Sequence, residues 1–327
     1  MNTTLNRRKA LSLAFAMSAA LAGASAFAQA YPNKPVKVIV PYNPGANPDI
    51  GARIVSQALQ ERLGQAFVIE NRTGAGGSIG TAAGAKSPPD GYTLVIGHVA
   101  GMAINPSVYA SLQYDPIKDF VPIAQAYKSP LLLAVADGSP YKNIADLVAA
   151  AKAKPGELNF SSGGNGTGAH LSGESLAGQS GVTMRHIPYK SVGASLIAVA
   201  NGEVAFAFGN GALIWPLVQG KKLRVLAFSG DARVAEYPDV PLVAETIKGF
   251  EYHDWAGFMA PAGTPADIVA KLQREIAAVV ANPEVAKQMR TAGLIPVQSS
   301  TELFAKHIAA EGAKWSALAK KINLKLD

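Results

Sequence analysis

Short apolar runs alternate with amphipathic segments along most of this chain, and this alternation is what most limits the folds open to it. The first run, 36–40, reads Val-Lys-Val-Ile-Val, and a helical pattern follows it from 47 to 63. The same order of strand and then helix recurs at 131–153, 158–177 and 185–200. Such alternation is typical of α/β proteins with mostly parallel sheets and helices on both faces. A chain of 327 residues has room for two such units.

The first helix carries start and stop signals. In Asn47-Pro48-Asp49, Asn47 is a good N-cap, Pro48 suits the first helical position, and Asp49 suits the first turn. Gly64 predicts the end of this helix. An apolar stripe near a 3.6-residue period predicts its inward face, which comprises Ile50, Ile54, Ala58, Leu59 and Leu63.

The first 28 residues have the three parts of a secretory signal peptide. Arg7, Arg8 and Lys9 precede an Ala-rich apolar run, and Ala26-Phe27-Ala28 is the small-x-small pattern found before a cleavage site. The apolar run is shorter than the roughly 20 residues that a bilayer span needs, which favours export over a membrane anchor. We therefore expect 1–28 to be removed and the mature protein to lie outside the cytoplasm.

The charge of the chain does not point to a polymer partner. The formal net charge is +7, but the signal peptide holds three of the 30 basic residues and no acid, which leaves 27 basic against 23 acidic residues. No block of like charges and no basic groove with interleaved aromatic residues occurs, so nucleic acid is rejected as a partner. The chain has no cysteine, which rules out disulfides, thiolate metal sites and thiol nucleophiles.

Patterns for catalysis and cofactors are also missing. Among the five histidines no pair has the i, i+4 spacing of a metal site. The segment 173–177, Gly-Glu-Ser-Leu-Ala, lacks the second glycine of a nucleophile elbow, and the glycines at 74–80 do not have dinucleotide-loop spacing. We predict no catalytic residues, metal or cofactor, and keep a secreted hydrolase with an unrecognised site as the alternative.

Two loops that follow strands have the composition of anion-binding loops. The segment 161–168 reads Ser-Ser-Gly-Gly-Asn-Gly-Thr-Gly, between a strand and a helix, and 41–47 holds the equivalent place after the first strand. Glycine lets backbone N–H groups converge, and a helix N-terminus adds the positive end of its dipole. Facing each other across a cleft, two such loops would bind a carboxylate or phosphate.

A set of short motifs, in order and with characteristic spacing, resembles the substrate-binding proteins of tripartite tricarboxylate transporters, also called the Bug family. The set runs from about residue 31 to the end of the chain. Its clearest members are 31–36 (Tyr-Pro-Asn-Lys-Pro-Val), 70–77 (Glu-Asn-Arg-Thr-Gly-Ala-Gly-Gly), 89–94 (Pro-Asp-Gly-Tyr-Thr-Leu), 188–190 (Pro-Tyr-Lys), 237–241 (Tyr-Pro-Asp-Val-Pro) and 260–265 (Ala-Pro-Ala-Gly-Thr-Pro).

The resemblance implies a periplasmic, two-lobed α/β receptor of the type II binding-protein fold, which closes on a small organic anion and delivers it to membrane permease subunits. It implies lobe 1 at 29–130 with 255–327, lobe 2 at 131–254, and a monomer. A receptor that reports to a sensor kinase is an open alternative. We expect ligand contacts at Tyr42, Asn43, Gly45, Ala46, Asn47, His98, Ser161, Gly163, Gly164, Asn165, Gly166, Thr167, His170, Tyr189, Lys190, Phe208 and Asn210.

Several of these positions have a second interpretation. His170 is as well placed to brace the glycine-rich loop, and Phe208 to fill the core. Two departures from the family pattern concern the ligand: Pro48 removes a backbone donor, and Gly209 stands where an acid is frequent. The loss of that acid predicts a di-, tri- or aromatic carboxylate without an amino group.

Overall fold

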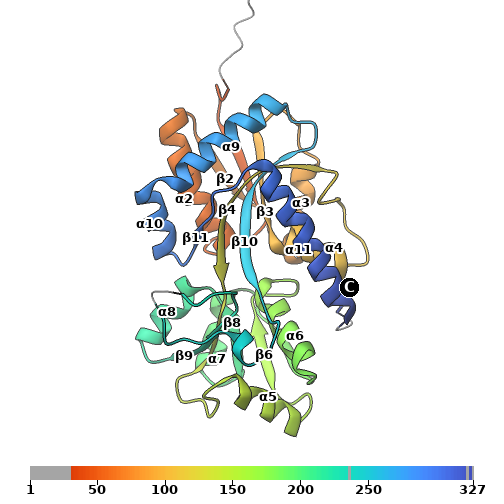
Figure 1. Cartoon of the computed structure of the whole chain (residues 1–327), viewed down its shortest axis with the longest axis vertical. Coiled ribbons are helices and arrows are strands. Elements are labelled where there is room, and N and C mark those ends of the chain that lie inside the picture. The colour runs from red at the N-terminus through yellow and green to blue at the C-terminus, as the bar shows by residue number, and fades with distance from the viewer. Residues whose placement is uncertain (1–30, 235–236, 322–323, 326–327) are drawn as a thin grey trace, which may run out of the picture. The chain divides into compact units, whose positions relative to one another are not determined.

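The computed structural model describes residues 31–234, 237–321 and 324–325. The predicted signal peptide, 1–28, lies outside the described residues. The architecture below is that of the compact unit that begins at Lys34. Its described residues form two lobes, each built on one sheet with helices on both faces (Figure 1). No described helix is long and apolar enough to cross a membrane.

The described strands of lobe 1 form a six-stranded sheet in the order β11-β4-β10-β3-β1-β2. The pairs of β1 with β2 and β3 are parallel, whereas β10 pairs antiparallel with β3 and β4, and β11 antiparallel with β4. The bounds are β1 Val36–Val40, β2 Phe67–Asn71, β3 Thr93–His98, β4 Phe120–Pro130, β10 His253–Pro261 and β11 Ile295–Pro296. The helices of this lobe are α2 Asn47–Leu63, α3 Ser78–Ala85, α4 Asn105–Val108, α9 Ala266–Ala281, α10 Pro283–Thr291 and α11 Thr301–Lys321.

Lobe 2 has a five-stranded sheet, as far as the chain is described, in the order β7-β6-β8-β5-β9. Strand β6 is parallel to β7 and β8, and β5 is antiparallel to β8 and β9. The bounds are β5 Leu132–Ala136, β6 Asn159–Ser162, β7 Arg185–Pro188, β8 Phe206–Gly209 and β9 Leu223–Phe228. The helices are α5 Ile144–Ala153, α6 Gly168–Ser180, α7 Val192–Ala200 and α8 Gly211–Gln219.

The two-lobed α/β prediction is confirmed, but both sheets are mixed rather than mostly parallel. The antiparallel pairing of β4 with β10 has a topological cause. Strand β4 leads the chain out of lobe 1 into β5, and β10 brings it back beside β4, so these two strands must run in opposite directions (Figure 1).

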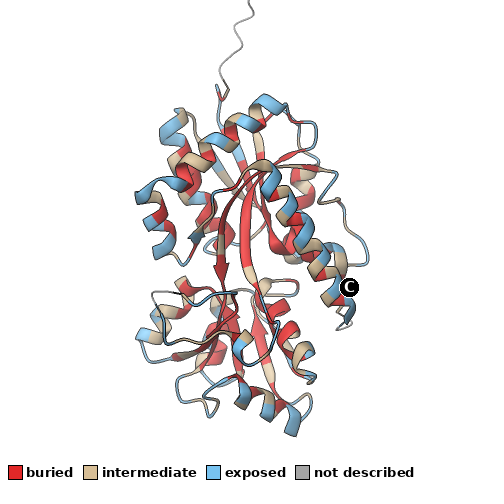
Figure 2. Cartoon of the chain, viewed as in Figure 1, coloured by how far each residue is buried: buried red, intermediate tan, exposed pale blue. Residues whose placement is uncertain are grey.

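Buried residues follow the strands and the inner sides of the helices in each lobe (Figure 2). The predicted inward face of α2 is confirmed only at Leu59 and is wrong for the rest of the stripe. Ala52, Val55 and Leu59 are buried, while Ile54 and Ala58 are only half-buried. Helix α2 lies close to β4 at Gly51, where a Cβ atom would stand 2.6 Å from a ring carbon of Tyr127, and this rotates the buried side toward the small residues.

One serine joins the segments that connect the lobes. Ser229 is fully buried, and its Oγ accepts a hydrogen bond from Leu131 N–H at 2.8 Å and donates one to Tyr252 O at 2.7 Å. Backbone bonds link the same three residues, from Ser229 N to Leu131 O and from Tyr252 N to Ser229 O. Ser229 therefore fixes the two connecting segments to each other.

Candidate ligand-binding cleft

Among the described residues, four helices begin at one cleft between the lobes, of about 310 Å³. Their N-cap residues, Ala46 of α2, Thr167 of α6, Ser191 of α7 and Asn210 of α8, all line it. A helix N-terminus presents N–H groups without intrahelical partners and the positive end of a dipole. No lysine or arginine is among the described lining residues. The cleft is therefore suited to an anion through backbone groups rather than cationic side chains.

Asp49 shapes the loop at the start of α2. Its carboxylate accepts hydrogen bonds from Gly45 N–H at 2.9 Å, Asn71 Nδ2 at 2.9 Å and Arg53 Nε at 3.0 Å. Burial works to raise the pKa of Asp49, but these hydrogen bonds outweigh it and lower the pKa. The acid thus holds Gly45 at its positive φ of 82° and positions the loop rather than facing the ligand.

The predicted helix start is one residue out of register. Ala46 is the N-cap of α2, and Asn47 and Pro48 are its first helical residues, so the prediction of Asn47 as N-cap is wrong. The cause is tertiary. Asn47 Nδ2 donates a hydrogen bond at 2.9 Å to Asp254 Oδ2, which lies 207 residues away in the sequence. This bond holds the Asn47 side chain away from the backbone N–H groups that an N-cap would bind.

His98 and Asp254 form the polar wall of lobe 1. His98 Nε2 is hydrogen-bonded to Asp254 Oδ1, and Tyr252 OH donates to the same oxygen at 3.3 Å. His98 Nδ1 accepts from Ala100 N–H at 3.3 Å and lies 2.9 Å from Tyr42 OH. These bonds fix the His98 ring between Asp254 and Tyr42.

Tyr42 joins this wall to the loop at 74–77. Its hydroxyl lies within hydrogen-bond reach of both His98 Nδ1 and the Gly76 carbonyl, at 2.9 and 3.1 Å. Burial is the main cause that raises its pKa well above the usual value for tyrosine. A Tyr–His–Asp row resembles a nucleophilic triad, but a phenol held this firmly in its protonated form is a poor nucleophile.

The glycine-rich loop of lobe 2 is braced from behind. His170 Nδ1 accepts from Gly166 N–H at 3.1 Å, and its ring stacks on His186 with 3.9 Å between centroids. Thr167 caps α6, with Oγ1 accepting from His170 N–H at 3.4 Å. The structure thus places His170 in the supporting role, buried beneath the loop.

The predicted contact residues fall into two groups. The cleft is lined by Tyr42, Asn43, Gly45, Ala46, Asn47, His98, Gly163, Thr167 and Asn210. The others, which lie behind or beside it, are Ser161, Gly164, Asn165, Gly166, His170, Tyr189, Lys190 and Phe208. Ser161 and Phe208 are fully buried. Ser161 Oγ donates to Ser195 O at 3.2 Å, and Phe208 stacks on Phe250 in the core.

Sequence reasoning missed part of the lining. Ser191, Val192 and Gly193 at the start of α7, Leu131 and Leu213, and above all Asp254 also face the cleft. The Ser191 side chain caps α7 through Ala194 N–H at 3.2 Å, and a serine before an apolar helix was the available signal. The cleft therefore contains an acid after all, which comes from β10 instead of position 209.

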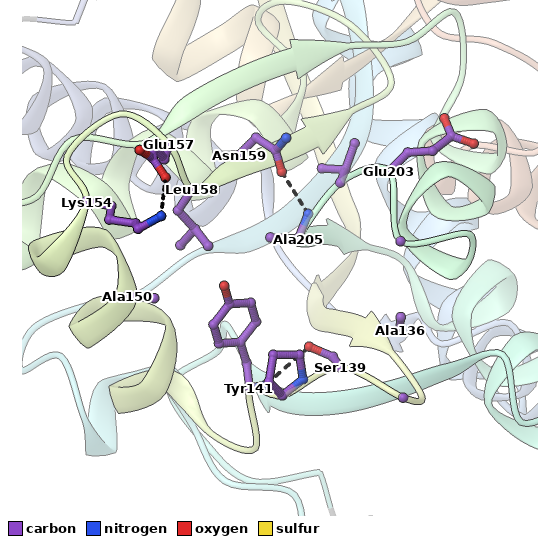
Figure 3. Close-up of a pocket in the computed structure, with 14 residues that line it drawn as sticks. Ala136, Ser139, Tyr141, Ala150, Lys154, Glu157, Leu158, Asn159, Glu203 and Ala205 are labelled. Atoms are coloured by element: carbon purple, nitrogen blue, oxygen red, sulfur yellow. Dashed lines mark hydrogen bonds and ion pairs between the residues drawn. The ribbon is translucent and has the colours of Figure 1, made fainter.

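A second hollow, of about 510 Å³, lies at the opposite end of the lobe 2 sheet (Figure 3). Several of its polar groups are already paired. Lys154 Nζ bonds Glu157 at 2.9 Å, and Asn159 Oδ1 accepts from Ala205 N–H at 2.8 Å. Its lining includes the C-terminal end of α5 at Ala150 and Lys154. We place the candidate site in the interlobe cleft for these reasons. The described residues contain no group of three or more acids and histidines that could hold a metal ion.

The fold and the cleft define a solute-binding protein of the periplasmic type. The model of the tripartite tricarboxylate transporter family receptors matches residues 51–324, and the chain belongs to this family. BugT of Bordetella pertussis is 34% identical over 301 residues, which cover 91% of this chain and 92% of BugT.

Solved structures agree with this assignment. A Rhodopseudomonas palustris protein solved with adipate superposes with a TM-score of 0.85 at 33% identity, covering 90% of this chain and 99% of that one. The periplasmic binding protein BugD superposes with a TM-score of 0.82 at 29% identity, covering 90% and 99%.

Proposed function

We propose that this protein is a periplasmic receptor that captures a small organic carboxylate between its lobes and delivers it to the permease of a tripartite tricarboxylate-type transporter. The observation that carries the proposal is the convergence of the N-termini of α2, α6, α7 and α8 on one cleft without a lysine or arginine among its described lining residues. The signal peptide predicted at 1–28 supports the location, and the match to the tripartite tricarboxylate transporter family receptors supports the partner. The adipate bound to the R. palustris relative supports the ligand class.

The binding step needs lobe movement but no chemistry. We keep the predicted lobes, 29–130 with 255–327 for lobe 1 and 131–254 for lobe 2, except that His253 and Asp254, which belong to β10 of the first sheet, are assigned to lobe 1. Closure around the segments that Ser229 joins excludes water from the ligand. Exclusion of water strengthens each hydrogen bond to the anion. Both walls come from one chain, so a monomer suffices. The contact residues are the nine predicted ones that line the cleft, together with Ser191, Val192 and Gly193.

The ligand that stays bound to the protein during purification tests the proposal. The mature chain, purified from the periplasm without refolding, is examined by native mass spectrometry for a retained anion, and its melting is followed with mono-, di-, tri- and aromatic carboxylates. A cognate ligand at 100 times its Kd stabilises the folded state by about 2.7 kcal/mol. Neutral amides of the same acids are the control. Absence of both a retained anion and any carboxylate-specific shift would refute the proposal.

A further inference from the structure

We infer that the ligand is a monocarboxylate with an uncharged, mainly apolar body, whose carboxylate binds the lobe 2 wall and whose far end faces Asp254. This inference rests on the proposed function and narrows its ligand class. Asp254 is then the specificity-determining residue that excludes a second carboxylate from lobe 1.

The two walls of the cleft differ in charge. Lobe 2 contributes the N-termini of α6, α7 and α8, and no acid of lobe 2 is among its described lining residues. Among the described helices, lobe 1 contributes only α2, whose second helical residue, Pro48, has no N–H to donate. Because each N-terminus attracts an anion, a carboxylate is bound more strongly on the lobe 2 side.

Asp254 makes the lobe 1 wall unfavourable for a second carboxylate. Its side chain is 8% exposed and lines the cleft, and it accepts hydrogen bonds from His98, Asn47 and Tyr252. Among the described residues, no lysine or arginine forms an ion pair with this carboxylate. A ligand carboxylate beside it would meet a like charge in a site of low dielectric, where repulsion is strong.

Asn47 adds a second acceptor on the same side. Because its Nδ2 points to Asp254, its Oδ1 is left buried, with no hydrogen-bond partner among the described residues. Acceptors on this wall suit an amide or hydroxyl end and oppose a carboxylate. An ammonium end is opposed by the dipoles of the four helices.

The remaining surface of the cleft is largely apolar. The side chains of Pro44, Pro48, Leu131, Val192 and Leu213 line it. Together with the absence of lysine and arginine from the described lining, this leaves a second negative charge without a counter-ion. One anionic end and an apolar body therefore match the surface best.

The test compares ligands that differ only in the charge of one end. Calorimetric titration at about pH 7.5, where both acid groups are ionised, measures three matched pairs: adipate and its monoamide, terephthalate and 4-carbamoylbenzoate, and succinate and its monoamide. We expect each monoamide that binds to have an affinity at least about tenfold higher than that of its diacid. A diacid equal to or tighter than its monoamide overturns the inference, as does tighter binding of 6-aminohexanoate than of the adipate monoamide.

The variant Asp254→Asn keeps the shape of the side chain and removes its charge. The preference for the monoamide should shrink to about threefold or less, mainly through a gain for the diacid. Asp137→Asn, which alters an exposed acid just after β5, should keep the wild-type ratio. An unchanged ratio in folded Asp254→Asn protein contradicts the inference. If Asp254→Asn does not unfold cooperatively, the monoamide-to-diacid affinity ratios of the wild-type protein decide the inference by themselves. Failure of every carboxylate to bind refutes instead the proposed function.

Discussion

Gly76 of lobe 1 lies directly against Gly166 of lobe 2. A Cβ atom on Gly76 would stand 3.3 Å from both the Cα and the carbonyl oxygen of Gly166. Gly76 also has a φ of +60°, and its carbonyl accepts hydrogen bonds from Tyr42 OH and Asn105 Nδ2. The two glycine-rich loops thus approach each other with their backbones, and a side chain at this point would keep the lobes apart.

The variant Gly76→Ala should lose ligand affinity because the added methyl group meets the backbone of Gly166 when the lobes approach. The positive φ also costs stability, about 1 kcal/mol. Gly181→Ala separates the two effects, since Gly181 has a φ of +64° and nothing within 4 Å of its Cβ position. Calorimetry and urea unfolding of both variants check this. Equal ligand affinities of the Gly76→Ala and Gly181→Ala variants would show that the contact between Gly76 and Gly166 does not limit closure of the lobes.

Asn210→Asp should weaken anion binding by at least about tenfold, because it adds a negative charge at a helix start in the cleft. The Asn210 side chain caps α8 through Leu213 N–H at 3.0 Å, and aspartate preserves that cap. Asn143→Asp is the matched control, since Asn143 caps α5 through Asp146 N–H at 2.9 Å and lies outside the cleft lining. Loss of affinity in both variants, measured by titration, would count against a local effect.

Ser229→Ala should lower the free energy of unfolding by about 1–3 kcal/mol, because it leaves Leu131 N–H and Tyr252 O with fewer partners in a buried place. Ser172→Ala provides the comparison. Ser172 is also fully buried, but its Oγ has no partner among the described residues, so its loss should change stability by less than about 0.5 kcal/mol. Chemical denaturation of the two variants gives both values.

Acid should destabilise the protein through His186. Burial, with help from the neighbouring His170, lowers the pKa of His186 from 6.5 to about 3. As the pH falls from 6.5 toward 3, the unfolded chain binds a proton that the folded protein does not, so the free energy of unfolding falls. His186→Phe should make the fall in the free energy of unfolding between pH 7 and pH 5 smaller, by about the amount that one proton bound by the unfolded chain contributes. The same loss in both proteins, by urea unfolding, would assign the effect to other groups.

Local patterns were reliable where neighbours in sequence decide the structure. Strand β1 has its predicted bounds, helix α5 ends at 153 as predicted, and Gly64 ends α2 in the left-handed conformation as predicted. The long strand β4 and helix α8 were not predicted. In β4 the apolar residues do not alternate clearly with polar ones, because both faces of the strand are covered for most of its length.

The inward faces of helices were harder to predict, because burial depends on what packs against them. The stripe on α2 contained the half-buried Ile54 and Ala58, and Ile268 in α9 is half-buried while its neighbour Val269 is buried. Periodicity gives the width of an apolar stripe, whereas close approach of a strand or a second helix selects which side of it faces the core.

The sequence by itself determined most of the element types and the two anion-loop segments at the ends of strands, because each depends on a few consecutive residues. Tertiary structure alone decided the charge of the cleft. It brings Asp254 to Asn47 across 207 residues and to His98 across 156, and it turns the α7 and α8 N-termini to the same point. The effect of a buried carboxylate depends on the hydrogen-bond donors around it. Contacts between residues so far apart in the sequence form only when the sheets pack.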